Sequence, residues 1–227
     1  MIDIHSHILF GVDDGSRDLE ESIEMLKAAK DAGFDKIIAT PHVMRSNYNK
    51  DGAKRSMEIL RPYAEEIGIK LYQGYEYNCY ALSDDGIKGA LEYCTEGTNT
   101  ILLEFKSDVG FPTNWESIVM NIQREGGNII VAHPERYRQA QRRIDQIRRT
   151  AELGCELQLD ALSLIEPGLF NKTKKCAEKL LESGMISWVA SDAHSAEDYK
   201  AFKRLFGNSK KSRLFLPDRY SDYSDLD

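Results

Sequence analysis

Short apolar runs rich in β-branched residues recur along the chain at a spacing of about thirty residues, the size of one strand-helix-strand unit. Runs of this composition and length predict β-strands. Seven of them are present, at residues 1–4, 36–40, 69–73, 100–105, 128–132, 155–159 and 186–190.

Amphipathic stretches lie between the predicted strands. In residues 18–32 the apolar side chains fall on one helical face, Asp18 and Glu21 have the spacing of a capping box, and Gly33 follows. Seven strands that alternate with helices, without a Gly-rich dinucleotide-binding turn, favour a parallel barrel over an open doubly wound sheet. We therefore predict an α/β protein built as a (β/α)7 barrel. Helical patterns also cover 53–67, 114–125, 142–153 and 171–183, whereas 83–98 gives only a weak one.

Composition changes this picture little. The chain has 227 residues, of which 41% are hydrophobic and 30% charged, as in an ordinary globular domain. We place one domain at 1–215 and expect residues 216–227, an acidic segment that contains Tyr220 and Tyr223, to form a flexible tail. The net charge of −7 argues against nucleic acid as a partner. Because no signal sequence or long apolar stretch is found, we expect a cytoplasmic protein without membrane insertion, and the oligomeric state stays open.

The cysteines exclude one kind of chemistry. None of the four is followed by an arginine six positions later, so the cysteine-nucleophile loop of one class of tyrosine phosphatase is missing. No CxxC pair is present either, and in a reducing compartment we expect small buried thiols rather than ligands or nucleophiles. The four are Cys79, Cys94, Cys155 and Cys176.

Histidines and carboxylates gather where the predicted strands end. The carboxyl ends of strands in such a barrel meet at one mouth, so their polar side chains would converge. These side chains could have other roles: the histidines could lie in polar loops, and the buried glutamates could form ion pairs with arginines. So many candidate ligands at one end of the barrel nevertheless favour a metal site. The histidines are His5, His7, His42, His133 and His194, and the carboxylates are Asp14, Glu76, Glu104 and Asp192.

Nine candidate ligands are too many for one four- to six-coordinate ion, so two or three ions are implied. Imidazole and carboxylate ligands without thiolate suit Mn²⁺, Fe²⁺ or Zn²⁺, and the residues alone do not choose among these. Adjacent ions would hold a bridging hydroxide and neutralise phosphate oxygens, which predicts phosphoester hydrolysis. Arg136, three positions beyond His133, could grip a phosphoryl group; its alternative role is an ion pair with a ligand carboxylate or with Glu135.

Several motifs match one known family. HSH at 5–7, TPH at 40–42, LEF at 103–105 and SDAH at 191–194 form a general pattern, and GVDDGS at 11–16 with HPERY at 133–137 is more specific. With these segments the chain resembles the polymerase and histidinol phosphatase (PHP) superfamily, and within it the bacterial manganese-dependent protein tyrosine phosphatases associated with capsule and exopolysaccharide operons. The resemblance covers nearly the whole predicted domain.

The resemblance implies a distorted seven-stranded barrel with a trinuclear centre, for which Mn²⁺ is the expected ion and Fe or Zn the alternative. It implies hydrolysis of phosphotyrosine by metal-bound hydroxide, without a cysteine nucleophile, on the tail of a bacterial tyrosine kinase or a related protein of capsule regulation. Arg136 would contact phosphate, and we assign catalysis to Arg136, Asp14 and His42. The implied metal ligands are His5, His7, Asp14, His42, Glu76, Glu104, His133, Asp192 and His194.

Substrate contacts are less defined. This chain departs from the family pattern at Tyr77-Asn78, where a basic residue is lost, and at Asp160, where asparagine is usual. Near the predicted ligands we expect Arg45, Tyr48 and Arg138 to bind substrate, with a solvated surface as the alternative. Two other functions compete with the first: another PHP phosphoesterase, acting on histidinol phosphate or nucleic-acid ends, and a metal-binding module without activity.

Overall fold

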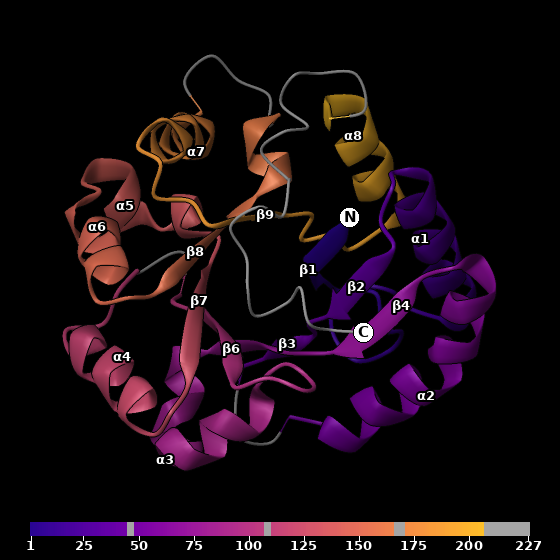
Figure 1. Cartoon of the computed structure of the whole chain (residues 1–227), viewed down its shortest axis with the longest axis horizontal. Coiled ribbons are helices and arrows are strands. Elements are labelled where there is room, and N and C mark those ends of the chain that lie inside the picture. Colours follow the sequence, from indigo (N-terminus) through magenta and orange to yellow (C-terminus); the bar gives the residue numbers. More distant parts are fainter. Residues whose placement is uncertain (45–47, 107–109, 166–170, 207–227) are drawn as a thin grey trace.

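The fold is an α/β arrangement in which parallel strands surround a common centre and helices lie outside them (Figure 1). The computed structural model describes residues 1–44, 48–106, 110–165 and 171–206. The tail predicted at 216–227 lies outside these residues, as does Arg45. None of the described helices combines the length and the apolarity that a membrane span requires.

All seven predicted strands are confirmed, and two short strands accompany them. The strands are β1 (Ile2–Ser6), β2 (Lys36–Ala39), β3 (His42–Val43), β4 (Lys70–Gln73), β5 (Glu76–Asn78), β6 (Thr100–Glu104), β7 (Asn128–Ala132), β8 (Glu156–Asp160) and β9 (Trp188–Ala190).

The predicted α/β class is confirmed, but a single closed seven-stranded barrel is not. The strands pair in two parallel sheets, one with the order β1-β2-β4 and the other with the order β3-β5-β6-β7-β8-β9. The short strand β3 follows the predicted second strand after Pro41, which has no backbone N–H to donate, and the short strand β5 follows the predicted third strand after Gly74 and Tyr75. A Cβ atom at Gly74 would lie 2.6 Å from Ile38 Cγ2, so this close approach requires glycine.

The last strand of the six-stranded sheet returns to the first strand of the chain. Ser6 and Ala193 form a parallel bridge beyond the end of β9, and the His7 backbone N–H donates to the Ala193 carbonyl at 2.9 Å. This contact places the segment after β1 beside the segment after β9. Both segments carry predicted metal ligands.

The helices agree with the amphipathic pattern in most places. Asp18 caps the first helix by accepting from the Glu21 backbone N–H at 2.9 Å, as the predicted capping box requires. The helix predicted at 142–153 is confirmed as the helix over 145–152, whereas the short helix over 138–142 before it and the last helix of the chain were not predicted. The helices are α1 (Leu19–Asp31), α2 (Lys50–Ile67), α3 (Leu82–Ala90), α4 (Trp115–Arg124), α5 (Arg138–Arg142), α6 (Asp145–Glu152), α7 (Lys172–Glu182) and α8 (Ala196–Phe206), and the 3₁₀ turns are η1 (Cys79–Ala81), η2 (Leu91–Tyr93), η3 (Pro134–Arg136) and η4 (Ala161–Leu164).

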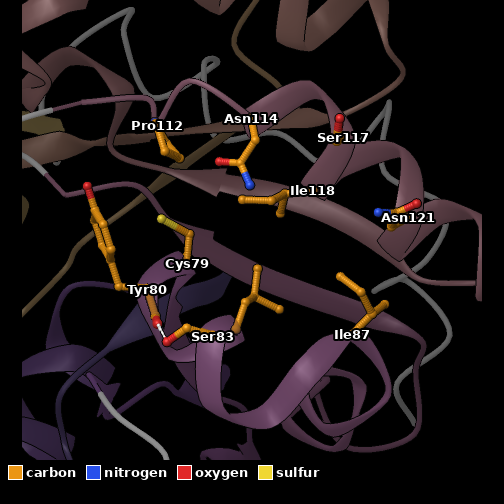
Figure 2. A pocket seen from close by; sticks show the side chains of 10 residues that line it. Cys79, Tyr80, Ser83, Ile87, Pro112, Asn114, Ser117, Ile118 and Asn121 are labelled. Atoms are coloured by element: carbon orange, nitrogen blue, oxygen red, sulfur yellow. Dashed lines mark hydrogen bonds between the residues drawn. The ribbon is translucent and has the colours of Figure 1, made fainter.

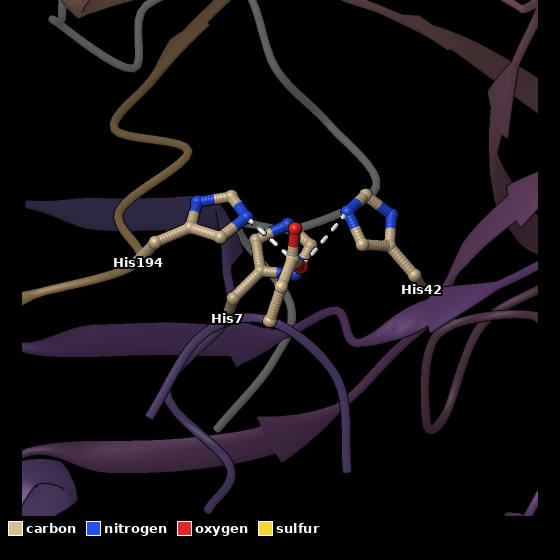
Figure 3. Close-up of side chains that lie close together, drawn as sticks. His7, His42 and His194 are labelled. Atoms are coloured by element: carbon tan, nitrogen blue, oxygen red, sulfur yellow. Dashed lines mark ion pairs between the residues drawn. The ribbon is translucent and has the colours of Figure 1, made fainter. Parts of the chain in front are cut away.

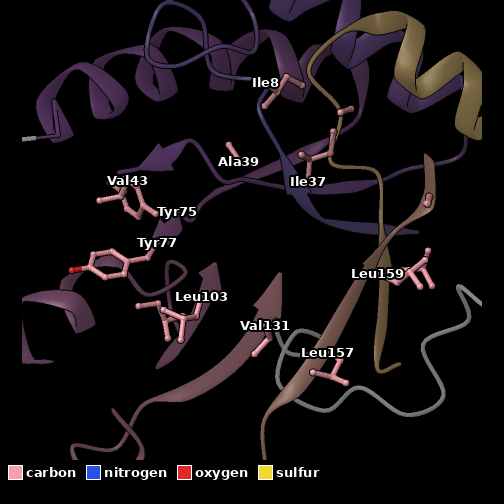
Figure 4. Packing of buried hydrophobic residues seen from close by; sticks show 14 of the residues in the cluster. Ile8, Ile37, Ala39, Val43, Tyr75, Tyr77, Leu103, Val131, Leu157 and Leu159 are labelled. Carbon is pink, nitrogen blue, oxygen red and sulfur yellow. The ribbon is translucent and has the colours of Figure 1, made fainter. Parts of the chain in front are cut away.

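Alternation along the strands separates two apolar clusters. The larger cluster fills the space between strands and helices and includes Leu157 and Leu159 of β8 (Figure 4). The smaller one includes Ile4, Leu102 and Trp188, each from a different strand. Because successive side chains of a strand point to opposite faces, residues 158 and 160 of β8 point away from the face that Leu157 and Leu159 pack against the helices.

The four cysteines are unpaired, as expected. Cys79, Cys155 and Cys176 are buried and Cys94 is half-buried. Burial raises the pKa of the Cys79 and Cys155 thiols to about 12 and that of the Cys94 and Cys176 thiols to about 11. Thiols that stay protonated at neutral pH are poor nucleophiles.

Candidate metal centre

The strand ends bring the predicted ligands together. All of them except His133 fall in three groups, and within each group one ligand atom from every residue lies within 4.8 Å of the others. His133 lies beside these groups, with its Nε2 atom 2.6 Å from Glu76 Oε1. The first group is His5, His7, Glu76 and Asp192; the second is His7, Asp14, His42 and His194; the third is His42, Glu76 and Glu104.

The first group has the spacing of a coordination shell. His5 Nε2 lies 3.2 Å from His7 Nε2, and Asp192 Oδ1 lies 3.1 Å from each of these nitrogens. Glu76 Oε2 is 3.3 Å from His5 Nε2 and 3.5 Å from His7 Nε2. With bonds of about 2.1 Å to one ion, neighbouring ligand atoms are about 3.0 Å apart in an octahedron and about 3.4 Å in a tetrahedron. All four side chains are buried.

The second group is more open to solvent. His42 Nε2 and His194 Nε2 approach Asp14 Oδ1 at 3.4 and 3.5 Å. Figure 3 shows the imidazoles of His7, His42 and His194 close together. The His194 ring stacks on the His7 ring with 3.9 Å between centroids. The Asp14 side chain is 72% exposed, so this side of the centre is accessible from outside.

The third group lies beside β5 and β6. His42 Nδ1 is 2.7 Å from Glu76 Oε2, so Glu76 belongs to two of the groups. Asn78 Nδ2 donates to Glu104 Oε2 at 2.7 Å. Asn78 is one of the departures from the family pattern, and its amide orients a predicted ligand.

Unsatisfied buried atoms indicate that these side chains fit a divalent cation. Glu76 Oε2 and Asp192 Oδ1 are buried and accept no hydrogen bond from the part of the chain that the structure describes, although imidazole nitrogens lie close to both. Leaving buried carboxylate oxygens without donors is costly. A divalent ion between them would satisfy these atoms, and the donor set of imidazole and carboxylate is one that Mn²⁺, Fe²⁺ and Zn²⁺ accept.

The electrostatics of the centre point the same way. Burial disfavours the charged form of Glu76, yet His5, His42 and His133 hold the pKa of this carboxyl well below its ordinary value. Burial also opposes protonation of His5, but Asp192 and Glu76 raise the pKa of its imidazole to about 9. Protonated imidazoles and carboxylates therefore balance each other in the protein alone, and a metal ion would take the place of the protons.

Residues outside the predicted set orient the ligands. Asp13 Oδ2 lies 2.7 Å from His7 Nδ1 and also accepts from the His42 backbone N–H at 3.1 Å. Carboxylates that hold the second nitrogen of a ligating imidazole are common around metals. The sequence pointed to the Asp13-Asp14 pair, but the motif does not distinguish the ligand from the residue that orients it.

A second buried carboxyl joins the two ends of the fold. Asp3 Oδ2 accepts from the Ser191 hydroxyl at 2.5 Å and from the Tyr199 hydroxyl at 2.9 Å, and Asp3 Oδ1 accepts from the Ser191 backbone N–H at 3.0 Å. Asp3 precedes His5 by two positions, and Ser191 directly precedes Asp192. These hydrogen bonds therefore hold two ligand-bearing segments side by side. No motif of the sequence predicted this role of Asp3.

Arg136 lies between two carboxylates. Its Nη1 atom is 2.7 Å from Asp192 Oδ2, and its Nη2 atom is 2.6 Å from Asp160 Oδ2. The ion pair with a ligand carboxylate, the alternative role in the sequence analysis, is thus present. The Arg136 side chain is 34% exposed, so part of it is accessible from outside. Glu135 is fully buried and accepts from the Asp160 backbone N–H at 3.1 Å.

The predicted substrate-binding residues have different surroundings. Tyr48 is half-buried, and its ring packs edge-on against Tyr75 at 5.9 Å and Tyr93 at 6.4 Å between centroids. Arg138 is exposed at the start of α5.

A cavity of about 350 Å³ lies between α3 and α4 (Figure 2). Cys79, Tyr80 and Ser83 form one wall, and Asn114 and Ile118 belong to the other. Among the residues that the structure describes, none that lines the cavity is charged. Cys79 directly follows Asn78, the residue that hydrogen-bonds Glu104, and the Glu104 carboxylate adds to burial in raising the pKa of the Cys79 thiol, so this wall of the cavity lies near a predicted ligand.

Comparison with known proteins gives one consistent match. Residues 1–202 match the family described as capsular polysaccharide synthesis, CpsB/CapC. The putative tyrosine-protein phosphatase CapC of Staphylococcus aureus is 34% identical over 227 residues, covering 96% of this chain and 86% of the relative. The tyrosine-protein phosphatase YwqE of Bacillus subtilis is 34% identical over 233 residues, covering 100% and 91%. CpsB of Streptococcus agalactiae, also named a tyrosine-protein phosphatase, is 31% identical and covers 97% of both chains.

Solved structures agree with this match. A chain from the crystal structures of YwqE from Bacillus subtilis and CpsB from Streptococcus pneumoniae, described as metal-dependent tyrosine phosphatases, superposes with a TM-score of 0.74. It is 29% identical and covers 95% of this chain and 91% of the other. An amidohydrolase from Mycoplasma synoviae shares the fold alone, with a TM-score of 0.56 and 13% identity, covering 99% of this chain and 83% of the other.

Proposed function

The chain belongs to the CpsB/CapC family of capsular polysaccharide synthesis, whose curated relatives are tyrosine-protein phosphatases, and we propose that its strand-end centre hydrolyses phosphotyrosine in proteins with the help of divalent metal. One observation carries the site assignment. The Nε2 atoms of His5 and His7 lie 3.1 to 3.5 Å from each other and from carboxylate oxygens of Glu76 and Asp192, and all four side chains are buried. Arg136 pairs with the other oxygen of Asp192.

The proposed ligands are the nine residues named from the sequence, with Mn²⁺ as the ion we expect. When bound, divalent ions lower the pKa of water and neutralise phosphoryl oxygens. The protein orients the rings. Asp13 Oδ2 contacts Nδ1 of His7, and the Asp192 carbonyl oxygen lies 2.9 Å from Nδ1 of His194. In each of these two histidines, Nε2 is therefore the nitrogen that can bind a metal ion. The exposed side at Asp14 gives substrate a path to the centre.

Arg136 is placed to hold the phosphoryl group. Two of its five N–H donors are directed at Asp160 and Asp192, and the remaining ones are available on a side chain that is one-third exposed. A planar guanidinium suits phosphate oxygens and stabilises the charge that develops on them. The tyrosine leaving group has an ordinary pKa of about 10, far below that of a serine hydroxyl. Hydrolysis of phosphotyrosine therefore depends less on a dedicated general acid than hydrolysis of phosphoserine does.

We also propose a particular substrate and a cellular location, which the family name does not specify. We propose the phosphotyrosine-rich tail of a bacterial tyrosine kinase, or a related protein of capsule regulation, as the substrate. We propose a cytoplasmic location, which the four unpaired cysteines support because disulfides are rare there. Comparison of phosphotyrosyl peptide, histidinol phosphate and single-stranded DNA as substrates, each with Mn²⁺, separates this function from other phosphoesterase activities. Equal or faster turnover of histidinol phosphate would contradict it.

A chelator and a thiol reagent should have opposite effects on the activity. We expect EDTA to remove hydrolysis of a phosphotyrosyl peptide and added Mn²⁺ to restore it, because the reaction depends on metal. Iodoacetamide should leave the rate unchanged, since burial keeps the thiols protonated with pKa values of about 11 to 12. Initial rates before and after each treatment check this. Loss of activity with iodoacetamide and persistence with EDTA would exclude the proposed mechanism.

The uncharged cavity beside Glu104 suits a neutral side chain next to the phosphotyrosine. Ser83 is exposed on its wall, and Ser83→Trp should fill it. We expect kcat/KM to fall about tenfold for a phosphotyrosyl peptide with a flanking leucine, the equivalent of one lost apolar contact, and to stay unchanged for p-nitrophenyl phosphate. Lys88→Trp on the exposed side of the same helix is the control. Equal losses on both substrates, or no loss, would exclude this role for the cavity.

A further inference from the structure

Gln158 is a fully buried side chain of β8 that lies between two of the proposed ligands. Its Oε1 atom is 3.0 Å from His5 Nδ1 and 3.2 Å from the His133 backbone nitrogen. The strand pattern explains this position, because Leu157 and Leu159 pack toward the helices and residue 158 points the other way. No motif of the sequence drew attention to this residue.

The contact with His133 fixes the direction of the amide. A backbone N–H can only donate a hydrogen bond, so the Gln158 atom that meets it must be the oxygen. The same oxygen can only accept from His5, and His5 Nδ1 must therefore carry a proton. In neutral His5 the free lone pair is then on Nε2.

His5 Nε2 is the atom that faces the first ligand group. It lies 3.1 Å from Asp192 Oδ1 and 3.3 Å from Glu76 Oε2. A single amide oxygen thus determines which nitrogen of His5 is presented to a metal. The same oxygen holds the His133 backbone, which has a φ of 29°, a conformation that a non-glycine residue adopts only when its surroundings impose it.

We infer that Gln158 is a positioning residue of the metal centre, which sets the tautomer of His5 and ties the end of β7 to the end of β1. This inference rests on the proposed metal-dependent function. Groups that hold the second nitrogen of a ligating histidine change metal affinity by about 10- to 100-fold when they are removed.

Gln158→Met keeps a similar volume and removes the acceptor. Two buried N–H donors, one on His5 and one on His133, then lose their partner. We expect the dissociation constant for Zn²⁺, used as a diamagnetic probe, to rise about 10- to 100-fold. Gln158→Glu retains an acceptor at the same place and should bind Zn²⁺ within about threefold of the unchanged protein.

Gln123→Met is the matched control, because the Gln123 amide donates to the Leu153 carbonyl at the end of α6 and belongs to none of the ligand groups, so the Zn²⁺ affinity should stay unchanged. The measurement is titration of the metal-free protein with Zn²⁺ against a competing chelator. Thermal unfolding of the metal-free variants shows whether Gln158→Met still folds. A loss of affinity in both Gln158 variants, or in neither, would overturn the inference.

The tautomer itself gives a test that needs no variant. In the Zn²⁺-loaded protein, ¹⁵N NMR of the histidines should show His5 protonated at Nδ1 and metal-bound at Nε2. Protonation at Nε2 would overturn the inference while leaving the proposed phosphatase function intact. Failure of the unchanged protein to bind Zn²⁺ and Mn²⁺ would instead remove the metal centre, and both proposals with it.

Discussion

Asp192→Ala is expected to lower kcat/KM for a phosphotyrosyl peptide by at least about a thousandfold and to remove metal from the first ligand group. The Asp192 carboxylate faces three cationic or ligating groups at once: its Oδ1 atom lies 3.1 Å from His5 Nε2 and His7 Nε2, and its Oδ2 atom lies 2.7 Å from Arg136 Nη1. Without this carboxylate, the first group loses one of its four ligands, and the imidazoles of His5 and His7 and the Arg136 guanidinium lose the negative charge between them.

Metal content and turnover should be measured on the same Asp192→Ala preparation. His194→Ala is an informative second variant, since His194 belongs only to the second group; it should cost about one ion per chain and leave the first group able to bind. Asp145→Ala, on an exposed residue that pairs with Arg143, controls for the loss of one negative charge. Full metal content with full turnover in Asp192→Ala would show that Asp192 is not a ligand.

The positions of the strands could be predicted because each apolar run carries its own signal. The division into two sheets could not be predicted, since β3 has two residues and β5 has three, too few for any periodicity to appear. Whether such short segments join one sheet or another depends on their partners. Pro41 and Gly74 lie between the predicted strands and the short strands that follow them, but neither residue determines which strand the following segment pairs with.

The candidate ligands could be predicted for a reason that does not depend on the sheet order. In any arrangement of parallel strands linked by helices, the carboxyl ends of the strands lie at one edge, so residues that follow the strands gather there. The residues that orient the ligands carry no such signal. Gln158 lies within a strand, and only the packing of Leu157 and Leu159 against the helices decides that its amide points toward His5.

The charges of the centre explain why metal and protons compete for it. His5 has a pKa raised to about 9, and Glu76 has one held well below its ordinary value, burial opposing both shifts. Metal binding at neutral pH must therefore release a proton from His5, and metal affinity should fall as the pH is lowered. The same charges draw Arg136 toward Asp192, which places a fixed positive group at the edge of the metal centre.

Arg136→Ala is expected to keep the metal and to lower kcat by about 10²- to 10³-fold at saturating Mn²⁺. The guanidinium is held by Asp160 at 2.6 Å and by Asp192 at 2.7 Å, and this fixed position should let its remaining N–H groups contact a phosphoryl oxygen. Arg136→Lys should recover only part of the rate, because an ammonium group cannot contact both carboxylates and a phosphoryl group in the same planar geometry.

The two roles of Arg136 predict different results, so the variant decides between them. If the arginine only steadies Asp192, Arg136→Ala would weaken Mn²⁺ binding, and enough Mn²⁺ would restore kcat. If it holds the phosphoryl group, kcat stays low at every Mn²⁺ concentration, and inhibition by inorganic phosphate weakens by a similar factor. We expect the second result, because the two carboxylates use two of the five N–H donors of a side chain that is 34% exposed, which leaves three donors for a phosphoryl group.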